Sequence, residues 1–533
     1  MNQQRNLFLA FALSMLVLFS WGALFPDEAD PLMPSPAEPK LETTATAPSA
    51  VISNRPDIGQ LSAPDAQPEI FSKQEKEPLT SAMISFGNDL LSLKVDPGSG
   101  TIHKALLNEY RQTIDRNSEP LSVLTDDGLH TIVMSTGILN DDVEVVFHLV
   151  NQETIRDTHS LMLQAELPGN RVWNRRLSMQ NGSYLVSIED KINNGGLRLY
   201  RQIVERNPEQ ETDTFYEHQG PIGFMDGSLK EVDYSDLIPG QTEKVSATGG
   251  WTGMMSRYFI SVIIPEQSQS YLYYYSGNGI TYQAGLIDEG VLKNGVTTYS
   301  AQLYLGPKSI PIMKDIGVKL ERSVDFGWFA FIAKPMHDLI MFLFGFVSNF
   351  GVSIILIVVL IKILFYWPSK KSYESMAGMR KLQPEVAKLK ELYGDDRQKM
   401  GQEMMGLYKK HKVNPLGGCL PIIIQIPVFF ALYKVLLISI EMRQAPFIGW
   451  IQDLSVQDPF FVLPVLMGIS MFVQQRLSPA PPDPVQAKLM KMLPIVFTAL
   501  FLFFPAGLVL YWLVNNLLSI LQQWYVMKQL DAL

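Results

Sequence analysis

A single lysine lies inside one of the most apolar stretches of this 533-residue chain. The stretch 350–367 reads FGVSIILIVVLIKILFYW, and its length suits the ~30 Å hydrocarbon core of a bilayer. A cation inside such a helix costs roughly 2.5–3.5 kcal/mol on insertion scales, so Lys362 needs a physical reason to be there. Two interpretations stay open: the ammonium group reaches the lipid headgroups on its flexible stem, or it lies in a hydrated, positively charged cavity.

Three other apolar stretches carry polar side chains at a similar depth. Counting 1.5 Å per residue from the basic end of each stretch places Gln425 and Thr498 about 10 Å inside, close to the ~9 Å depth of the lysine. On the last stretch, Asn515, Ser519 and Gln522 follow i, i+4, i+7 spacing and so share one helix face. Each residue alone is compatible with ordinary hydrogen bonding between helices. Because four helices place polar groups in the same half, the pattern predicts a wet groove that opens to the cytosol.

The elements that must position these residues are membrane spans. The apolar run within 1–25 predicts an N-terminal anchor, and a five-span core at 348–526 is predicted from the spans 350–367, 420–440, 459–475, 492–504 and 508–526. The segment 369–416 has eleven basic and six acidic residues, so the positive-inside rule places it in the cytosol. Its apolar residues recur with 3-4 spacing, which predicts a cytosolic helical hairpin. The predicted topology has six spans with both termini in the cytosol, and 527–533 forms a short cytosolic tail.

Two of the predicted spans are short. The span 492–504 would cover roughly 20 Å of the ~30 Å core, which predicts local thinning of the bilayer. The preceding segment 327–347 mixes charged and apolar residues and is predicted to be an amphipathic helix in the outer interface.

The segment 79–326 has the alternating pattern and turn residues of strands, and predicts a large antiparallel β-sandwich outside the cytosol. Hairpins are expected at 90–107, 184–203 and 271–284. The Pro-rich segment 26–78 predicts a disordered linker. Large aromatic residues of this domain pack in its core or line a sugar-binding groove; they are Trp173, Trp251, Tyr273 and Tyr275.

Composition excludes several function classes. A net charge of -9 gives no global nucleic-acid footprint, and a single cysteine allows no intrachain disulfide. No phosphate-binding Gly-rich loop and no metal-ligand spacing occur in the sequence, so no ATPase site, metal or cofactor is expected. The acidic residues of 79–326 are too dispersed to nominate a glycosidase pair.

Two stretches carry a family resemblance. The sequence NPLGGCLPIIIQIPVFFALY at 414–433 and the sequence FPAGLVLYW at 504–512 resemble the YidC/Oxa/Alb family of membrane protein insertases. The resemblance covers about 327–526, and the large β-domain after a first anchor is similar to the Gram-negative form. It implies a non-enzymatic insertase and chaperone of the bacterial inner membrane, which inserts, folds and assembles membrane proteins alone or with the Sec translocon. It also implies a periplasmic β-sandwich that contacts SecD and SecF, with nascent membrane proteins, the ribosome and membrane lipids as further partners.

The resemblance also implies roles for single residues. Lys362 falls at the groove cation, which is often Arg in the family, and Gln425 falls at the groove glutamine. Val358 stands where relatives can have a hydroxyl, and Lys528 is the only basic residue of a tail that is basic and ribosome-binding in some relatives. Residues matching positions of substrate contact, or lying on the helices of the apolar slide, are Tyr366, Phe429, Phe430, Phe497, Phe501, Tyr511 and Trp512.

Two other functions compete with this interpretation. One is a transporter or flippase with a periplasmic ligand-binding domain, which an inverted repeat and midplane charges would favour. The other is a membrane-anchored sugar-binding enzyme, whose chemistry would lie in the β-domain.

Overall fold

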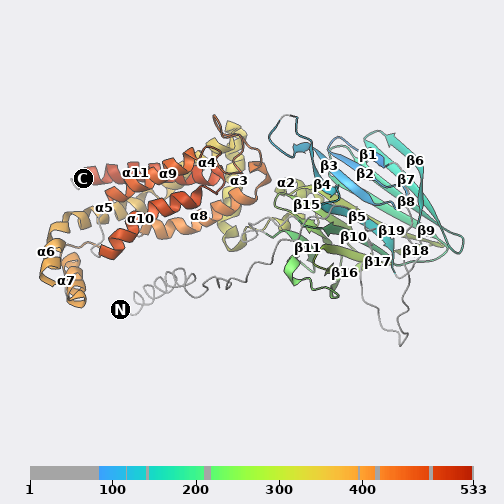
Figure 1. Ribbon diagram of the computed structural model, residues 1–533, viewed down its shortest axis with the longest axis horizontal. Coiled ribbons are helices and arrows are strands. Elements are labelled where there is room, and N and C mark those ends of the chain that lie inside the picture. The colour runs from blue at the N-terminus through green and yellow to red at the C-terminus, as the bar shows by residue number, and fades with distance from the viewer. Residues whose placement is uncertain are drawn as a thin grey trace, which may run out of the picture. The chain divides into compact units, whose positions relative to one another are not determined.

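The computed structural model describes residues 83–115, 117–139, 143, 145–208, 218–393, 396–414, 420–478 and 484–530. The predicted anchor 1–25 and the whole of the predicted linker 26–78 lie outside the described residues. Strands make up the described chain as far as Pro307, and helices follow it (Figure 1).

The strands form two antiparallel sheets that pack face to face around one apolar core. The order in the first sheet is β1 (Ile84–Gly87), β2 (Leu91–Val95), β3 (Ile102–Arg111), β4 (Pro120–Asp126), β5 (Thr131–Ile138), β10 (Leu199–Arg206), β17 (Thr281–Asp288), β16 (Ser270–Gly277) and β13 (Thr242–Thr248). The order in the second is β12 (Ser228–Glu231), β11 (Gly220–Met225), β14 (Trp251–Met255), β15 (Phe259–Pro265), β19 (Val296–Pro307), β9 (Leu185–Asn193), β8 (Arg171–Gln180), β7 (Thr158–Leu167) and β6 (Phe147–Ile155), with β18 (Val291–Lys293) paired to β19.

Alternation of buried and exposed residues shows how the strands meet the core. Along β8 every second side chain is buried, which is the pattern of a strand with one face on the core. Trp173, Trp251, Tyr273 and Tyr275 are all fully buried, so they pack in the core and line no exposed groove.

One of the three expected hairpins is wrong. The hairpins β2–β3 and β16–β17 form, but β9 pairs with β8 and β19 while β10 pairs with β5 and β17. The turn after β9 therefore carries the chain from one sheet to the other. Seven of the eight residues of β10 are buried, so this strand needs neighbours that cover both of its faces.

A buried ion network joins the two sheets. The Asp190 carboxylate of β9 accepts from Arg175 Nε at 2.8 Å and from the Trp173 indole at 2.7 Å, and it lies 2.9 Å from Arg201 Nη1 of β10. Arg201 Nε lies 3.8 Å from Asp288 Oδ2. Burial alone would raise the pKa of Asp190, but the two guanidinium groups outweigh it and hold that pKa below its ordinary value. The carboxylate is therefore charged, and the network depends on it.

Removing this charge is expected to destabilise the sandwich. D190N leaves Arg175 and Arg201 short of a buried counter-ion, which costs about 3–5 kcal/mol. Hydrogen exchange of β9 amides in the full chain measures the loss as a fall in the opening free energy. The control K191Q breaks the exposed pair of Lys191 with Glu189, and should change the same quantity by at most about 1 kcal/mol. Equal exchange in the two variants would show that the network contributes nothing.

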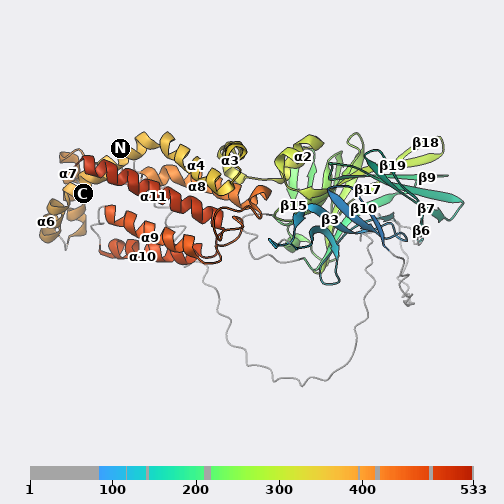
Figure 2. The same cartoon turned by 90° about the horizontal axis from the view of Figure 1, so that it is seen from above.

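The helices after the sandwich have these bounds: α2 (Ile310–Ile316), α3 (Ala330–Val347), α4 (Phe350–Leu364), α5 (Tyr366–Lys381), α6 (Gln383–Tyr393), α7 (Arg397–Lys410), α8 (Leu420–Ile438), α9 (Val462–Leu477), α10 (Pro484–Phe501) and α11 (Ala506–Gln529). Figure 1 and Figure 2 both show α9 running beside α11, and α11 also packs against α4 and α5. Helix α10 packs on α9, and α3 packs on α4 and α8.

Length and composition alone mark few of these helices as spans. Among the described residues, α3 is long and apolar enough to cross a membrane, and α4 with α5 qualifies if this pair, bent by 68°, counts as one span. Two shorter apolar helices, Gln425–Ile438 and Val462–Leu477, fall below the length required. The six-span count and the interfacial placement of 327–347 therefore stay predictions.

Several helix bounds differ from the expected ones. The predicted span 350–367 ends early, because α4 stops at Leu364 and α5 continues in a new direction. Helix α10 has 18 residues in place of the predicted 13, but the residues added at its start include Lys488 and Lys491, so the apolar part is not longer and the expected thinning stays a prediction. Its first residue is Pro484, and proline suits the first turn of a helix because it needs no N–H partner there. Helix α11 runs to Gln529, into the predicted tail.

The predicted helical hairpin is present as α6 and α7, which pack on each other. Apolar residues of the 3-4 pattern are half-buried along this seam: Val386, Leu389, Met400, Met404 and Leu407. The Asp396 carboxylate caps α7 by accepting from Lys399 N at 3.0 Å. The first residues of the predicted hairpin 369–416 belong to α5, which ends at Lys381. Leu382 separates α5 from α6.

Candidate functional site

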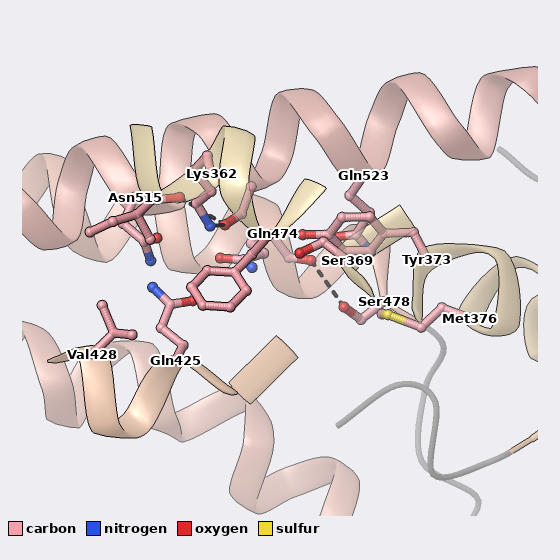
Figure 3. Close-up of a pocket in the computed structure, with 13 residues that line it drawn as sticks. Lys362, Ser369, Tyr373, Met376, Gln425, Val428, Gln474, Ser478, Asn515 and Gln523 are labelled. Atoms are coloured by element: carbon pink, nitrogen blue, oxygen red, sulfur yellow. Dashed lines mark hydrogen bonds between the residues drawn. The ribbon is translucent and has the colours of Figure 1, made fainter. Parts of the chain in front are cut away.

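A polar cavity of about 130 Å³ lies among the apolar helices. Its lining residues come from five segments: α4 and α5, α8, the end of α9, and α11. They are Ile361, Lys362, Phe365, Ser369, Tyr373, Met376, Gln425, Val428, Gln474, Ser478, Asn515, Ser519 and Gln523. Figure 3 shows Lys362 and Asn515 at one end of this group and Tyr373 and Ser478 at the other. Four of the six predicted polar residues therefore meet at one place, and Thr498 and Gln522 do not.

The bend after α4 explains how the cavity forms. Lys362 is in the last turn of α4, where a cation also stabilises the partial negative charge of the helix end. At Phe365 the chain turns by 68°, and α5 then packs on α11. The bend brings Tyr373 of α5 close to Ser519 of α11, and both line the cavity.

Lys362 is held by a hydroxyl and has no acidic partner. Its Nζ donates to Ser519 Oγ at 2.7 Å, and Ser519 Oγ donates in turn to the Asn515 carbonyl oxygen at 2.7 Å. Among the described residues no carboxylate lies within 4.0 Å of Lys362 Nζ, and the cavity lining contains no Asp or Glu. A cation in a partly enclosed cavity attracts an anion more strongly than the same cation in bulk water. The arrangement can therefore bind a carboxylate that arrives from elsewhere.

Primary amides supply most of the remaining polarity. Gln425 of α8, Gln474 of α9 and two residues of α11, Asn515 and Gln523, line the same cavity. The side chain of Gln425 lies beside the Tyr511 hydroxyl of α11. Each primary amide has both donors and an acceptor, so these groups can pair with either half of a peptide bond.

Thr498 is one predicted groove residue that the cavity does not contain. Its Oγ1 donates to the Pro494 carbonyl oxygen of its own helix at 2.6 Å. The same atom packs against α9 so closely that a Cβ added at Gly468 would lie 1.9 Å from it. The spacing in the sequence did not predict the direction in which Thr498 points.

Gln523 and Gln474 are cavity amides that sequence reasoning missed. The predicted face of α11 ran through Gln522, whose Nε2 instead donates to the Tyr366 carbonyl oxygen at 3.2 Å. At 3.6 residues per turn, i+7 and i+8 flank the same face, so Gln523 was an equal candidate. The hydroxyls of Ser369, Tyr373 and Ser478 were also missed, because these residues lie outside the predicted spans.

Most of the predicted slide residues form one aromatic cluster. Trp512 of α11 lies at its centre, with ring centroids 4.7 Å from Phe429, 5.4 Å from Phe501 and 6.3 Å from Phe497. Phe429 also contacts Phe430 at 5.5 Å and Tyr511 at 6.3 Å.

Exposure divides this cluster. Phe430 is 43% exposed, whereas Tyr511 and Phe501 are buried in this conformation. The seventh predicted residue, Tyr366, lies apart at the bend and is half-exposed.

Comparisons with known proteins identify both parts of the chain. Residues 342–532 match the family described as 60Kd inner membrane protein, and residues 83–339 match the YidC periplasmic domain. The chain is 40% identical over 472 residues to the membrane protein insertase YidC of Magnetococcus marinus, covering 84% of each chain. It is 36% identical to that of Hahella chejuensis, over 97% of this chain and 95% of the relative. It is 37% identical to that of Nitrosococcus oceani, over 99% of both.

These matches decide between the competing functions. The relatives are insertases and not enzymes, and they are inner membrane proteins with a periplasmic β-rich domain. The interpretations as a transporter and as a sugar-binding enzyme are therefore set aside. The chain belongs to the YidC family of membrane protein insertases.

Proposed function

We propose that this chain inserts membrane proteins by drawing a short acidic segment of the client into the Lys362 cavity from the cytosol. The single observation that carries the proposal is a lysine of an apolar helix that bonds a serine hydroxyl and, among the described residues, faces no carboxylate. A cation that only reached for the headgroups would have no reason to line a cavity with four primary amides. The client's carboxylate completes a pair that the chain itself leaves open.

The apolar part of the client then moves along the aromatic cluster into lipid. Phe430 and Trp512 offer apolar area next to the cavity, and the neighbouring faces of α9 and α10 expose Ile469, Val473 and Val496. Burying ~20 apolar residues in the bilayer releases far more free energy than one transient ion pair stores. The polar segment is thereby carried outward without ATP.

The remaining assignments belong to the same proposal. The chain works alone or with the Sec translocon, the segment 79–326 is a periplasmic docking surface for SecD and SecF, and both termini lie in the cytosol. The α6–α7 hairpin receives the nascent client or its ribosome, and its exposed basic side chains, which include Lys388, Lys409 and Lys410, support this role. Thr498 has no place in the cavity and supports the groove only through helix packing.

Crosslinking from the aromatic cluster tests the proposed path. A photoreactive side chain at Phe429 is expected to label the apolar segment of a nascent single-span client, because Phe429 is half-exposed beside both Trp512 and the cavity. A matched probe at Phe350, which is buried on α4 against Phe344, should not label it. Labelling at both positions, or at neither, would contradict a path along this cluster.

A further inference from the structure

The amide of Gln523 is buried without a partner. Its side chain is 1% exposed and lines the Lys362 cavity, and no described residue accepts a hydrogen bond from its Nε2. Buried donors in native proteins nearly always have a partner, so an unpaired one needs an explanation. Figure 3 shows Gln523 beside Tyr373, at the far end of the cavity from Asn515.

Gln523 is the end of a polar row along α11. Asn515, Ser519 and Gln523 are spaced i, i+4, i+8, so the row extends about 12 Å along the helix axis. At about 3.3 Å per residue, that length matches roughly four residues of extended peptide. Gln425 and Gln474 add amides to the cavity from two other helices.

An extended segment that leaves water needs partners for its backbone as well as for its side chains. Every residue except proline has one N–H and one C=O, and these groups are costly to bury unpaired whatever the sequence. A carboxylate would bind only donors, but a primary amide offers a donor and an acceptor and so suits peptide groups of any sequence. Lys362, by contrast, selects for negative charge.

We infer that Gln523 is a client-binding residue, which donates through its Nε2 to a backbone carbonyl of the client's extended polar segment. The inference rests on the proposed function and extends it: the amides bind the client's backbone regardless of sequence, and Lys362 adds a preference for acidic clients.

Two clients separate the two contributions. Their N-terminal tails are equal in length, one with two Asp residues and one with Asn in their place. In proteoliposomes holding the full chain, Q523L is expected to slow the appearance of both protease-protected tails by roughly three- to tenfold, the effect of one lost hydrogen bond. K362A should slow only the acidic client. The control Q529L makes the same substitution at an exposed position of α11 and should leave both rates unchanged.

The outcomes distinguish this inference from the proposed function. Wild-type rates in Q523L, or a loss confined to the acidic client, would overturn the role of Gln523 and leave that of Lys362 standing. If K362A changed the insertion rates of both clients equally, the role of Lys362 in selecting acidic clients would be overturned. A uniform loss of rate in Q523L would still be explained by backbone binding.

A crosslink at position 523 tests contact without relying on a rate. A photoreactive residue there should label the client's tail while insertion is arrested, even if Q523L folds poorly. Labelling of phospholipid alone would show that a lipid, and not a client, pairs with this position, and would contradict the inference.

Discussion

Insertion of clients with acidic tails is expected to fall at least tenfold in K362A and to be undetectable in K362E. Two unit charges 4 Å apart interact by about 4 kcal/mol at an effective dielectric constant near 20. Losing a third of that interaction in the transition state slows a step tenfold. Glutamate would instead repel the client's carboxylate and would compete with it for the Ser519 hydroxyl. Protease protection of the client's tail in cells depleted of the resident insertase measures these effects.

K362R is the conservative control. Arginine keeps the positive charge and can hold a carboxylate with two parallel hydrogen bonds, so insertion should remain near wild type. Ser519 gives a second control, because S519A removes the hydroxyl that accepts from Lys362 at 2.7 Å and keeps the charge. It should slow the acidic client less than K362A does. Wild-type insertion by K362A would show that the lysine is not the attractor.

Growth supported by this chain is expected to be lost in V386P. Val386 N donates to the Leu382 carbonyl oxygen at 3.0 Å at the start of α6, and proline has no N–H to make this bond. Proline inside a helix costs about 3 kcal/mol or more, and the half-buried seam between α6 and α7 would separate. Complementation of an insertase-depleted strain, with the protein level measured in the same membranes, tests this expectation.

V386A is the matched variant for the hairpin. Alanine keeps the backbone hydrogen bond and the helix, so it isolates the smaller loss of apolar contact in the seam. It should support growth at close to the normal level. If V386P also did so, the α6–α7 hairpin would have no role in receiving the client.

Spacing within a helix was enough to predict much of the site. Lys362, Gln425, Asn515 and Ser519 all line one cavity, because an isolated polar residue in an apolar helix is costly unless polar groups gather around it. Equal depth in several helices then indicates one shared site. The α6–α7 hairpin could be predicted from its 3-4 pattern for a related reason. Apolar residues on one face of a helix must pack against another apolar surface, and here α6 and α7 supply that surface to each other.

Direction and pairing could not be predicted in the same way. Gln522 and Gln523 flank the same predicted face of α11, and only the contact of Gln522 with the α4–α5 bend decides between them. Thr498 turns toward Gly468 because a residue without a side chain leaves room there. Pro368 lies three residues after the bend at Phe365 and cannot donate to the Leu364 carbonyl, so the sequence marks a weak point in the helix but not the angle of 68°.

The β-domain shows the same limit at the level of topology. Alternation identified β9 and β10 as strands, but the choice of partner depends on contacts far apart in the sequence. The Asn-Asn-Gly-Gly segment between them is as suitable for a change of sheet as for a tight hairpin. Similarly, Pro484 was taken for a loop residue although it begins α10.

A reciprocal exchange of charge tests the central claim most directly. The measurement is insertion of a client with a two-lysine tail by K362E in proteoliposomes without a membrane potential, because a potential acts on tail charges by ~2.3 kcal/mol per charge per 100 mV. If Lys362 attracts the client's tail by charge, K362E should insert the lysine-tailed client at least tenfold faster than the wild-type chain does, while failing with the acidic client. If K362E inserts both clients poorly, the two charges do not meet in the cavity and the account is wrong.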